Sequence, residues 1–585
     1  MSVPGKLHGL VERFDENLDA YRSGEYNEAQ VRVDFINPLL ELLGWDVYNS
    51  AGKPEAYRDV IYEDRVKIGG YTKAPDYGLY AAGSRRLFLE AKKPSVDLAD
   101  DVNPAVQLRR YAWSAKLPLS ILTDFEELAV YDCRLEPDKD DAPATARLDY
   151  FTYDQYADRW NELYALFSRD AVLNGSLEKY AEENRRRRGM ETVDAAFLRK
   201  IEGWRSALAR DFASRNDLNS RQLNYAVQMT VNRLVFLRMA EDRGIEDYGR
   251  LLGLVNGNGV YGRLRDLFRD ADDRYNSGLF HFRSERGREE EPDTLTLALE
   301  VDDEVLRGII RGLYYPESPY EFSVLPVDVL GQVYEQFLGR VIRLEGREAT
   351  VEEKPEVRKA GGVYYTPTYI VRYIVENTVG KLLEGKRPGP RGGVSRIKIV
   401  DPACGSGSFL IGAYQYLLDW HRDQYVADGP ENWPQMVYQG PGGQWHLTID
   451  EKKRILLNNI HGVDIDAQAV EVTKLSLLLK VLEGESEASI TRQLALIQAR
   501  ALPDLDDNIK CGNSLIGPDF YDNEQMSFLD EEEHYRINVF DWREAFPQVF
   551  EGENPGFDAV IGNPPYIRIQ ALKEFAPVEV EHYKR

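Results

Sequence analysis

The stretch Ile397-Lys-Ile-Val-Asp-Pro-Ala-Cys-Gly-Ser-Gly-Ser-Phe409 decides the fold of the second half of the chain. A short apolar strand leads into a turn with two glycines, and an apolar helix is expected from Ser408 to Leu418. Glycines in a strand-to-helix turn let the backbone approach a cofactor closely, as they do in nucleotide-binding folds. Because no Gly-Lys-Ser/Thr sequence follows, the turn does not favour a nucleoside triphosphate.

Two further motifs follow this turn. A second strand is expected to end at Asp464, where an acid suits the two hydroxyls of a ribose. The apolar strand Ala559-Val-Ile561 then leads into Asn563-Pro-Pro-Tyr566. The Asn563 side-chain oxygen and the next backbone carbonyl can accept both hydrogens of an amine and aim its lone pair at a methyl donor. The tyrosine can stack on a base that has been flipped out of a duplex.

Together these motifs resemble the S-adenosylmethionine site of DNA amino-methyltransferases. The resemblance implies a cofactor-binding set: Thr366, Asp401, Ala403, Gly405, Gly407, Asp464 and Asn513. It implies a catalytic set for methyl transfer: Asn563, Pro564, Pro565 and Tyr566. Within the first set, Asp401, Gly405 and Gly407 would border the methionine end of the cofactor, with Thr366 also contacting it. Asp464 would hold the ribose and Asn513 would face the adenine ring. The preceding Tyr364-Tyr-Thr-Pro367 matches the group that modifies adenine N6; cytosine N4, protein glutamine and ribosomal RNA are the alternative targets.

A second constellation, Pro75-Asp76 and Glu90-Ala-Lys92, lies in the first 150 residues. Hydrolysis of a phosphodiester with a metal ion needs carboxylates that hold the ion and a cation near the attacked phosphate. The two-residue period of a strand places Glu90 and Lys92 on one face. The alternative interpretation is a surface strand with mixed charges.

The surrounding sequence resembles the PD-(D/E)xK nuclease domains of restriction enzymes. The resemblance is carried by Glu28 at the start of a helix, by Phe35-Ile-Asn-Pro-Leu-Leu40, and by Gln107 and Tyr111 after the Glu-x-Lys strand. It implies catalytic roles for Asp76, Glu90 and Lys92, and Mg²⁺ ligands: Glu28, Asp76 and Glu90. For Gln107 and Tyr111, ordinary helix packing is the alternative.

The chain of 585 residues is expected to be a multidomain α/β protein. Three parts are expected: a PD-(D/E)xK nuclease-like α/β domain at 1–150, a helical connector at 151–350, and a Rossmann-like methyltransferase domain at 351–585. The chain resembles the N-terminal part of the type IIG (Eco57I-like) restriction-modification family. That resemblance places the last sheet strands and a target-recognition domain beyond residue 585, so we expect an incomplete sheet and a fragment or a second subunit. Sequence-specific methylation by the chain alone is not expected.

Composition limits the kinds of partner and cellular compartment that are expected. The formal net charge of −25 means that double-stranded DNA would have to bind through a local basic stripe. The run at 185–188 is interpreted as solvated surface. No stretch is apolar enough for a membrane helix, no signal peptide is found, and three separate cysteines fit a reducing cytoplasm.

There are two alternatives to a bifunctional enzyme: a methyltransferase with an inactive nuclease-like domain, and an inactive DNA-binding remnant. A type I motor subunit is disfavoured because the ATP-binding loop is absent.

Overall fold

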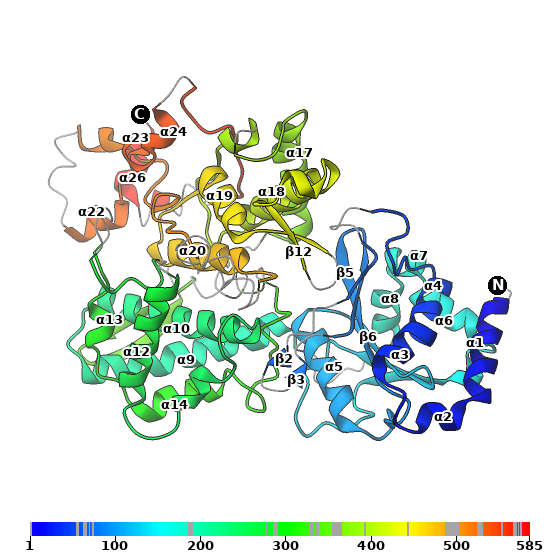
Figure 1. Cartoon of the computed structure of the whole chain (residues 1–585). Coiled ribbons are helices and arrows are strands. Elements are labelled where there is room, and N and C mark those ends of the chain that lie inside the picture. Colours follow the sequence, from blue (N-terminus) through cyan, green and yellow to red (C-terminus); the bar gives the residue numbers. More distant parts are fainter. Residues whose placement is uncertain are drawn as a thin grey trace. The chain divides into compact units, whose positions relative to one another are not determined.

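A computed structural model describes most of the chain, and the fold divides into two compact units that are described separately (Figure 1). Unit 1 comprises residues 1–196, 312–326 and 440–444, and unit 2 comprises the remainder. In the part of the chain that is described, no helix is long and apolar enough to cross a membrane. The described residues are 3–584 without 54–57, 63–66, 69–70, 73–74, 185–190, 276–277, 285–290, 327–328, 330, 332, 334–338, 354–365, 391–392, 441–443, 486–501, 523–530, 552–553, 565–569, 571 and 574–575.

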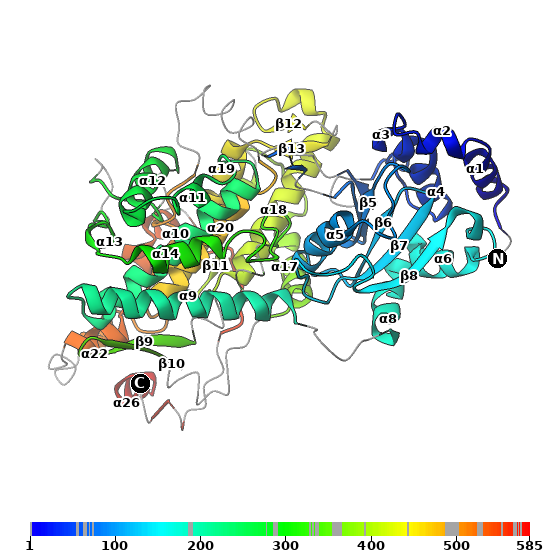
Figure 2. The same ribbon diagram turned by 90° about the horizontal axis from the view of Figure 1, so that it is seen from below.

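Unit 1 is built on a mixed sheet of six strands in the order β1-β4-β5-β6-β7-β8. Its strands are β1 (Val60–Ile61), β4 (Tyr77–Ala81), β5 (Ser84–Ala91), β6 (Leu119–Thr123), β7 (Glu127–Asp132) and β8 (Arg147–Thr152). Only the β5–β6 pair is parallel, and α5 (Val102–Ser114) makes the crossover between these two strands. Figure 2 shows α5 lying against β5 and β6. The short strands β2 (Lys67–Ile68) and β3 (Tyr71–Thr72) pair separately.

Helices cover the other face of the sheet. They are α1 (Gly5–Glu16), α2 (Leu18–Arg22), α3 (Glu28–Val31), the π-helical turn η1 (Arg32–Ile36), α4 (Asn37–Leu42), η3 (Tyr153–Gln155), α6 (Trp160–Phe167), α7 (Arg169–Leu173) and α8 (Ser176–Glu183). The helix expected to start at Glu28 is a continuous helical run from Glu28 to Leu42 that contains one π turn.

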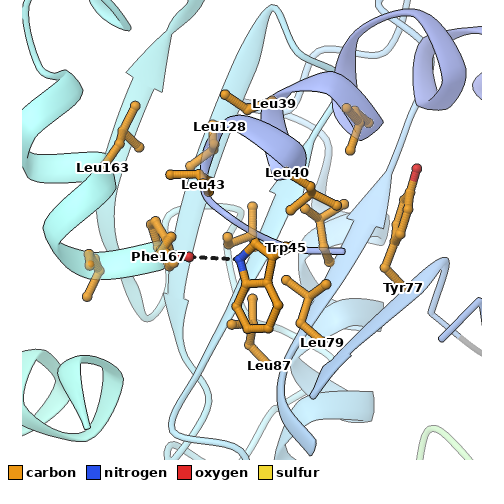
Figure 3. Close-up of a cluster of buried hydrophobic side chains, with 14 of the residues drawn as sticks. Leu39, Leu40, Leu43, Trp45, Tyr77, Leu79, Leu87, Leu128, Leu163 and Phe167 are labelled. Carbon is orange, nitrogen blue, oxygen red and sulfur yellow. Dashed lines mark hydrogen bonds between the residues drawn. The ribbon is translucent and has the colours of Figure 1, made fainter. Parts of the chain in front are cut away.

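The alternation of side chains along the strands explains why both faces are covered. On β5, Leu87 and Leu89 pack into the core beneath α3, α4 and α6–α8, whereas Phe88 packs into the smaller core beneath α5 on the opposite face. Figure 3 shows the larger core, where the Trp45 indole N–H donates a hydrogen bond of 2.9 Å to the Phe167 carbonyl. Burial of an indole with its N–H satisfied removes a large apolar surface from water at no polar cost.

Unit 1 continues beyond the boundary expected at residue 150. Trp160, Leu163 and Phe167 of α6 are part of the larger core, and Leu177 of α8 joins them. Val324, from a segment more than a hundred residues later, joins the smaller core. These segments belong to unit 1, whereas residues 197–311 and 327–350 belong to unit 2, so the expected connector contributes to both units.

The first part of unit 2 is helical. It contains α9 (Val193–Arg215, which begins in unit 1), α10 (Ser220–Asp242), α11 (Arg250–Gly253), α12 (Val260–Tyr275), α13 (Leu295–Ala298), α14 (Asp303–Arg311) and the hairpin β9 (Arg340–Glu345)–β10 (Glu348–Glu353). Helix α10 is buried along most of its length, and the Arg233 guanidinium on it pairs with Asp293 at 2.7 Å inside the core. Pairing of this kind is what makes a buried charge tolerable.

The second part of unit 2 carries a parallel sheet in the order β15-β14-β11-β16. Its strands are β11 (Ile399–Asp401), β14 (Ile460–Asp464), β15 (Ile509–Cys511) and β16 (Ala559–Val560). The order reverses beside β11, since the chain adds β14 and β15 on one side and β16 on the other. In open parallel sheets, ligands bind at the carboxyl ends of the strands at such a switch point. Within the described residues the sheet has four strands.

The remaining elements of unit 2 surround this sheet. They are α17 (Thr368–Leu383), η4 (Gly393–Arg396), α18 (Ser408–Ala427), η5 (Pro430–Asn432), β12 (Val437–Gln439), β13 (Trp445–Leu447), α19 (Ile449–Asn459), α20 (Ala467–Val481), η6 (Pro518–Asp522), α22 (Glu531–Ile537), α23 (Trp542–Ala545), α24 (Pro547–Phe550) and α26 (Pro577–Tyr583). Helix α18 extends the helix expected at 408–418 by more than two turns.

Candidate functional site

Strand pairing brings the two acids of the nuclease-like constellation together. Asp76 directly precedes β4, Glu90 lies near the end of β5, and the antiparallel pairing sets them side by side. The Asp76 backbone N–H donates to Glu90 Oε2 at 3.3 Å, and the Ala91 N–H donates to Asp76 Oδ2 at 2.9 Å. Both carboxylates are buried. Each therefore uses one oxygen to accept a backbone hydrogen bond and keeps the other for a different partner.

Lys92 and Glu28 complete the cluster that the sequence predicts. The Lys92 Nζ lies 2.5 Å from Glu90 Oε1 and 3.8 Å from Glu28 Oε1. Glu28 is the first residue of α3, whose start is fixed by a capping box between Asn27 and Gln30. The predicted proximity of Glu90 and Lys92 agrees with the structure, and carboxylates from two elements, α3 and β5, meet at the Lys92 ammonium group.

Burial sets the electrostatics of this cluster. It raises the pKa of Glu90 to about 7, helped by the charge of Asp76 and opposed by Lys92. Burial also lowers the pKa of Lys92, but the Glu90 carboxylate more than offsets this and the net shift is upward. Two close carboxylates that repel each other favour a bound cation, which removes the repulsion.

Arg32 belongs to this cluster although the sequence analysis missed it. Its Nη1 lies 3.3 Å from Asp76 Oδ1, and its guanidinium is stacked over the Tyr77 ring at 4.7 Å. A signal was present in the sequence: Arg32 follows Glu28 by four residues, a spacing that places both on one helical face. Tyr111, by contrast, packs in the core beneath α5, as the packing alternative predicts.

The pair Asp76–Glu90 fits Mg²⁺ as a partial ligand set. This ion takes six oxygen ligands, and proteins commonly supply one or two carboxylates while water and phosphate supply the rest. No group of three or more His, Cys, Asp or Glu side chains in the described part of the chain is arranged to hold a metal ion without such help. The metal role of Glu28, which contacts Lys92, stays a prediction.

In unit 2, the glycine-rich turn joins β11 to α18. Gly405 and Gly407 both have positive φ, +54° and +85°, which favours glycine at these positions. A Cβ on Gly407 would lie 2.9 Å from Thr473 Oγ1, whereas Gly405 has no heavy atom within 4 Å of its Cβ position. Gly405 therefore faces open space where a cofactor can approach the backbone, which fits the predicted S-adenosylmethionine site.

The strand-end acids hold this turn in place. Asp464, at the end of β14, accepts the Gly405 N–H through Oδ2 at 2.8 Å and the Asp466 N–H through Oδ1 at 2.9 Å. Asp401, at the end of β11, accepts the Ala403 N–H through Oδ1 at 3.1 Å. The two acids predicted at the cofactor thus lie at one loop. Each carboxylate oxygen can accept two hydrogen bonds, so a carboxylate can hold backbone N–H groups and ribose hydroxyls together.

Thr473 is a second residue that the sequence analysis missed. It lies on α20, is fully buried, and donates from Oγ1 to the Gly405 carbonyl at 2.8 Å. The hydroxyl and the tight contact at Gly407 hold the turn against α20. The sequence carries no specific signal for this role, because Thr473 lies among both apolar and charged residues of the helix.

Asn563 meets Thr366 beside this loop. The Asn563 Nδ2 donates to Thr366 Oγ1 at 3.1 Å, which joins two motifs separated by 197 residues. Asn563 is exposed, and Thr366 directly precedes Pro367, the N-cap of α17. With its amide nitrogen bonded to Thr366, the Asn563 side-chain oxygen remains an acceptor. Pro565 and Tyr566 lie outside the described residues, and Pro564 is exposed next to Asn563.

Gly562 lets the Asn563 segment approach Asp401. A Cβ at Gly562 would lie 2.6 Å from Asp401 Oδ1, so a larger residue would push the two strand ends apart. Burial, together with the charge of Asp464, raises the pKa of Asp401 to about 7. The carboxyl group therefore stands half protonated near neutral pH in the absence of a bound cation.

Asn513 follows β15 at the same edge of the sheet. It is buried, and its Oδ1 accepts the Leu515 N–H at 3.1 Å. The structure thus brings Thr366, Asp401, Asp464 and Asn563 to the carboxyl edge of one parallel sheet, with Asn513 at the end of the outer strand. The adenine-facing role of Asn513 stays a prediction.

Comparison with known proteins gives the family. Residues 458–585 match the family described as the Eco57I restriction-modification methylase. Over its full length the chain is 35% identical to RM.Eco57I, a type II restriction enzyme and methyltransferase of Escherichia coli, and it covers 55% of that protein. The family resemblance that the sequence indicates is thus confirmed: the chain is similar along its full length to an Eco57I-type restriction enzyme and methyltransferase, and its last part matches the Eco57I methylase family.

Two other relatives set the extent of the similarity. A putative type II restriction enzyme and methyltransferase of Methanocaldococcus jannaschii is 24% identical over 88% of this chain and 48% of its own length. BrxX, an adenine-specific methyltransferase of Escherichia coli, is 27% identical over 32% of this chain and 15% of its own length. The chain spans about half the length of its two type II relatives.

Proposed function

We propose that this chain carries the two active sites of a restriction-modification enzyme: an S-adenosylmethionine-dependent adenine-N6 DNA methyltransferase and a Mg²⁺-dependent DNA endonuclease. The observation that carries the proposal is the hydrogen bond between Asn563 and Thr366 beside Asp401, at the switch point of a parallel sheet. The cluster of Asp76, Glu90 and Lys92 supports the nuclease part.

In methyl transfer, the chain's task is to orient a weak nucleophile. The lone pair of an exocyclic amine is delocalised into the base. The Asn563 side-chain oxygen and the Pro564 carbonyl accept the two amine hydrogens, which draws the nitrogen toward tetrahedral geometry. S-adenosylmethionine supplies the electrophilic methyl group when it is bound. Thr366 fixes the Asn563 amide so that its oxygen, rather than its nitrogen, meets the amine.

Adenine N6 is the target that the observations favour. The Tyr364-Tyr-Thr-Pro367 motif matches the adenine-modifying group, and BrxX is named as adenine-specific. Double-stranded DNA is the proposed partner, and a flipped base would enter next to exposed Asn563.

In the nuclease-like site, Asp76 and Glu90 would hold Mg²⁺. The ion polarises a phosphoryl oxygen and lowers the pKa of attacking water when it is bound. Lys92 lies within reach of Glu90 and presents a positive charge where a phosphate would arrive. Its raised pKa keeps the ammonium protonated at neutral pH. Lys92 is thus suited to stabilise negative charge as the phosphodiester is attacked.

Methyl transfer is tested with tritium-labelled S-adenosylmethionine and plasmid DNA, an assay that counts transfer at any site and does not depend on sequence-specific methylation by the chain alone. We expect N563A to lose transfer while calorimetry shows that it still binds the cofactor, and we expect D464A to lose cofactor binding. Transfer by N563A at the natural rate would reject the assignment. Absence of cofactor binding by the natural chain would instead favour the inactive DNA-binding remnant.

Cleavage is tested by nicking of unmethylated supercoiled plasmid with and without Mg²⁺. We expect nicking only with the metal ion, and its loss in D76N and K92A. A natural chain that methylates DNA but does not nick it would favour the second candidate, a methyltransferase whose nuclease-like domain serves only to grip DNA.

A further inference from the structure

In the nuclease-like cluster, two cationic side chains contact the outward carboxylate oxygens, which are the Asp76 and Glu90 oxygens that accept no backbone hydrogen bond. Asp76 Oδ2 and Glu90 Oε2 accept backbone N–H groups, whereas Asp76 Oδ1 contacts Arg32 and Glu90 Oε1 contacts Lys92. The lone pairs that a divalent ion would use are therefore those that already face a guanidinium or an ammonium group. A metal ion and these side chains compete for the same oxygens.

Arg32 is held firmly in this position. Its guanidinium lies over the rings of Tyr77, at 4.7 Å, and Tyr62, at 5.1 Å, and the Tyr77 hydroxyl donates to Asn37 Oδ1 at 2.7 Å. The side chain is only 18% exposed. A cation packed against two adjacent tyrosine rings keeps its charge close to Asp76 and has restricted side-chain freedom.

We propose that Arg32 is a positioning residue that occupies Asp76 Oδ1 in the metal-free protein and competes there with the divalent ion. The inference rests on the proposed role of Asp76 and Glu90 as metal ligands. In the metal-free state, the guanidinium balances the charge of Asp76 and keeps its carboxylate turned toward Glu90. Asp76 and Glu90 would hold the ion, and Arg32 would then give up Asp76 Oδ1 while its charge stays beside the site.

A purely structural ion pair predicts a different result. If Arg32 only anchors the helical run 28–42 to β4, its removal loosens the site and weakens metal binding. If it competes with the ion, its removal strengthens metal binding, because a positive charge close to the ligand oxygens is lost. The direction of the change in affinity therefore separates the two roles.

The test measures Mn²⁺ binding to the full chain by electron paramagnetic resonance of the free ion, without DNA. It is done at pH 8, above the pKa of about 7 of Glu90, so that this carboxylate is mostly ionised in any variant that does not raise its pKa further. D76N defines the fraction of bound Mn²⁺ that belongs to this site. R32Q removes the charge and R32K keeps it. R22Q is the matched control, because Arg22 pairs with Glu126 in the same unit but away from this cluster.

We expect R32Q to bind the Asp76-dependent Mn²⁺ about threefold more tightly or better, since the competing charge is gone. R32K should stay closer to the natural chain, and R22Q should not differ from it. If D76N reduces Mn²⁺ binding but R32Q binds Mn²⁺ no more tightly than the natural chain, the role of Arg32 is rejected and the proposed metal site is retained. If the natural chain shows no D76N-sensitive binding, the proposed metal site and this inference both fail. Thermal unfolding of each variant shows whether R32Q remains folded.

Discussion

Asp401 lies almost fully buried at the end of β11, and its pKa is raised to about 7 by burial and by Asp464. Binding of a cation beside a carboxyl group lowers its pKa and releases a proton. S-adenosylmethionine carries an ammonium group at its methionine end, which the family resemblance places at Asp401. At pH 7 we therefore expect cofactor binding to release up to about half a proton, since a group with this pKa is half protonated.

Calorimetry in buffers with different ionisation enthalpies measures this release. The release should shrink toward zero at pH 9, where Asp401 is already ionised without the cofactor. D401N should bind S-adenosylmethionine without releasing a proton from position 401. An equal release by D401N and the natural chain would show that another group supplies the proton.

Gly562 yields a second prediction for a single residue. Since a Cβ would lie 2.6 Å from Asp401 Oδ1, G562A should displace either the carboxylate or the Asn563 segment. We expect G562A to weaken S-adenosylmethionine binding at least about tenfold, which corresponds to about 1.4 kcal/mol. The control is G203A on α9, where the added methyl group meets no heavy atom within 4 Å. Equal dissociation constants for both variants in calorimetry would contradict the prediction.

Among the elements, α3 links its N-terminal capping box to the nuclease-like cluster. Asn27 Oδ1 accepts the Gln30 N–H at 3.1 Å, and Gln30 Oε1 accepts the Asn27 N–H at 2.9 Å. Glu28, on the first turn, and Arg32, on the next, depend on this start. N27A removes an N-cap, which costs about 1 kcal/mol.

The free energy of unfolding from urea titration measures that cost. N27D, which keeps a capping oxygen, should recover most of the loss. We also expect N27A to reduce Mg²⁺-dependent nicking more than N27D does, because fraying of the first turn moves Glu28. A stability of N27A equal to that of the natural chain would show that packing alone fixes the helix start.

At the scale of the whole molecule, the two proposed ligands act on separate compact units. The cofactor residues lie in unit 2 and the metal residues in unit 1, and each unit has its own core. A ligand stabilises only the structure that binds it, by about 2.7 kcal/mol at a hundredfold excess over its dissociation constant. We expect S-adenosylmethionine to raise the midpoint of one calorimetric unfolding transition and leave another unchanged.

Two variants show which unit gives the transition whose midpoint the cofactor raises. D464A should abolish the effect of the cofactor, whereas D76N should leave it intact. A cofactor that raises the midpoints of all transitions equally would show that the two units unfold as one.

The local motifs of both sites could be predicted from sequence because they depend on short-range rules. The strand, turn and helix around Gly405 follow from glycine freedom and apolar periodicity, and the structure confirms them. The start of the helical run at Glu28 follows from its cap. Arg32 and Thr473 could not be predicted as site residues, because their roles arise from contacts with Asp76 and Gly405, which lie 44 and 68 residues away in the chain.

The sequence by itself determined the strand, turn and helix of each site and the residue types that each chemistry needs, because these depend on backbone preferences within a few residues. Only the tertiary structure decided which charges share a carboxylate and where the cores end. It set Arg32 and Lys92 on the outward oxygens of Asp76 and Glu90, and it joined α6–α8 to unit 1. The physical reason is that strand pairing and burial act between distant residues, and burial fixes how strongly neighbouring charges interact.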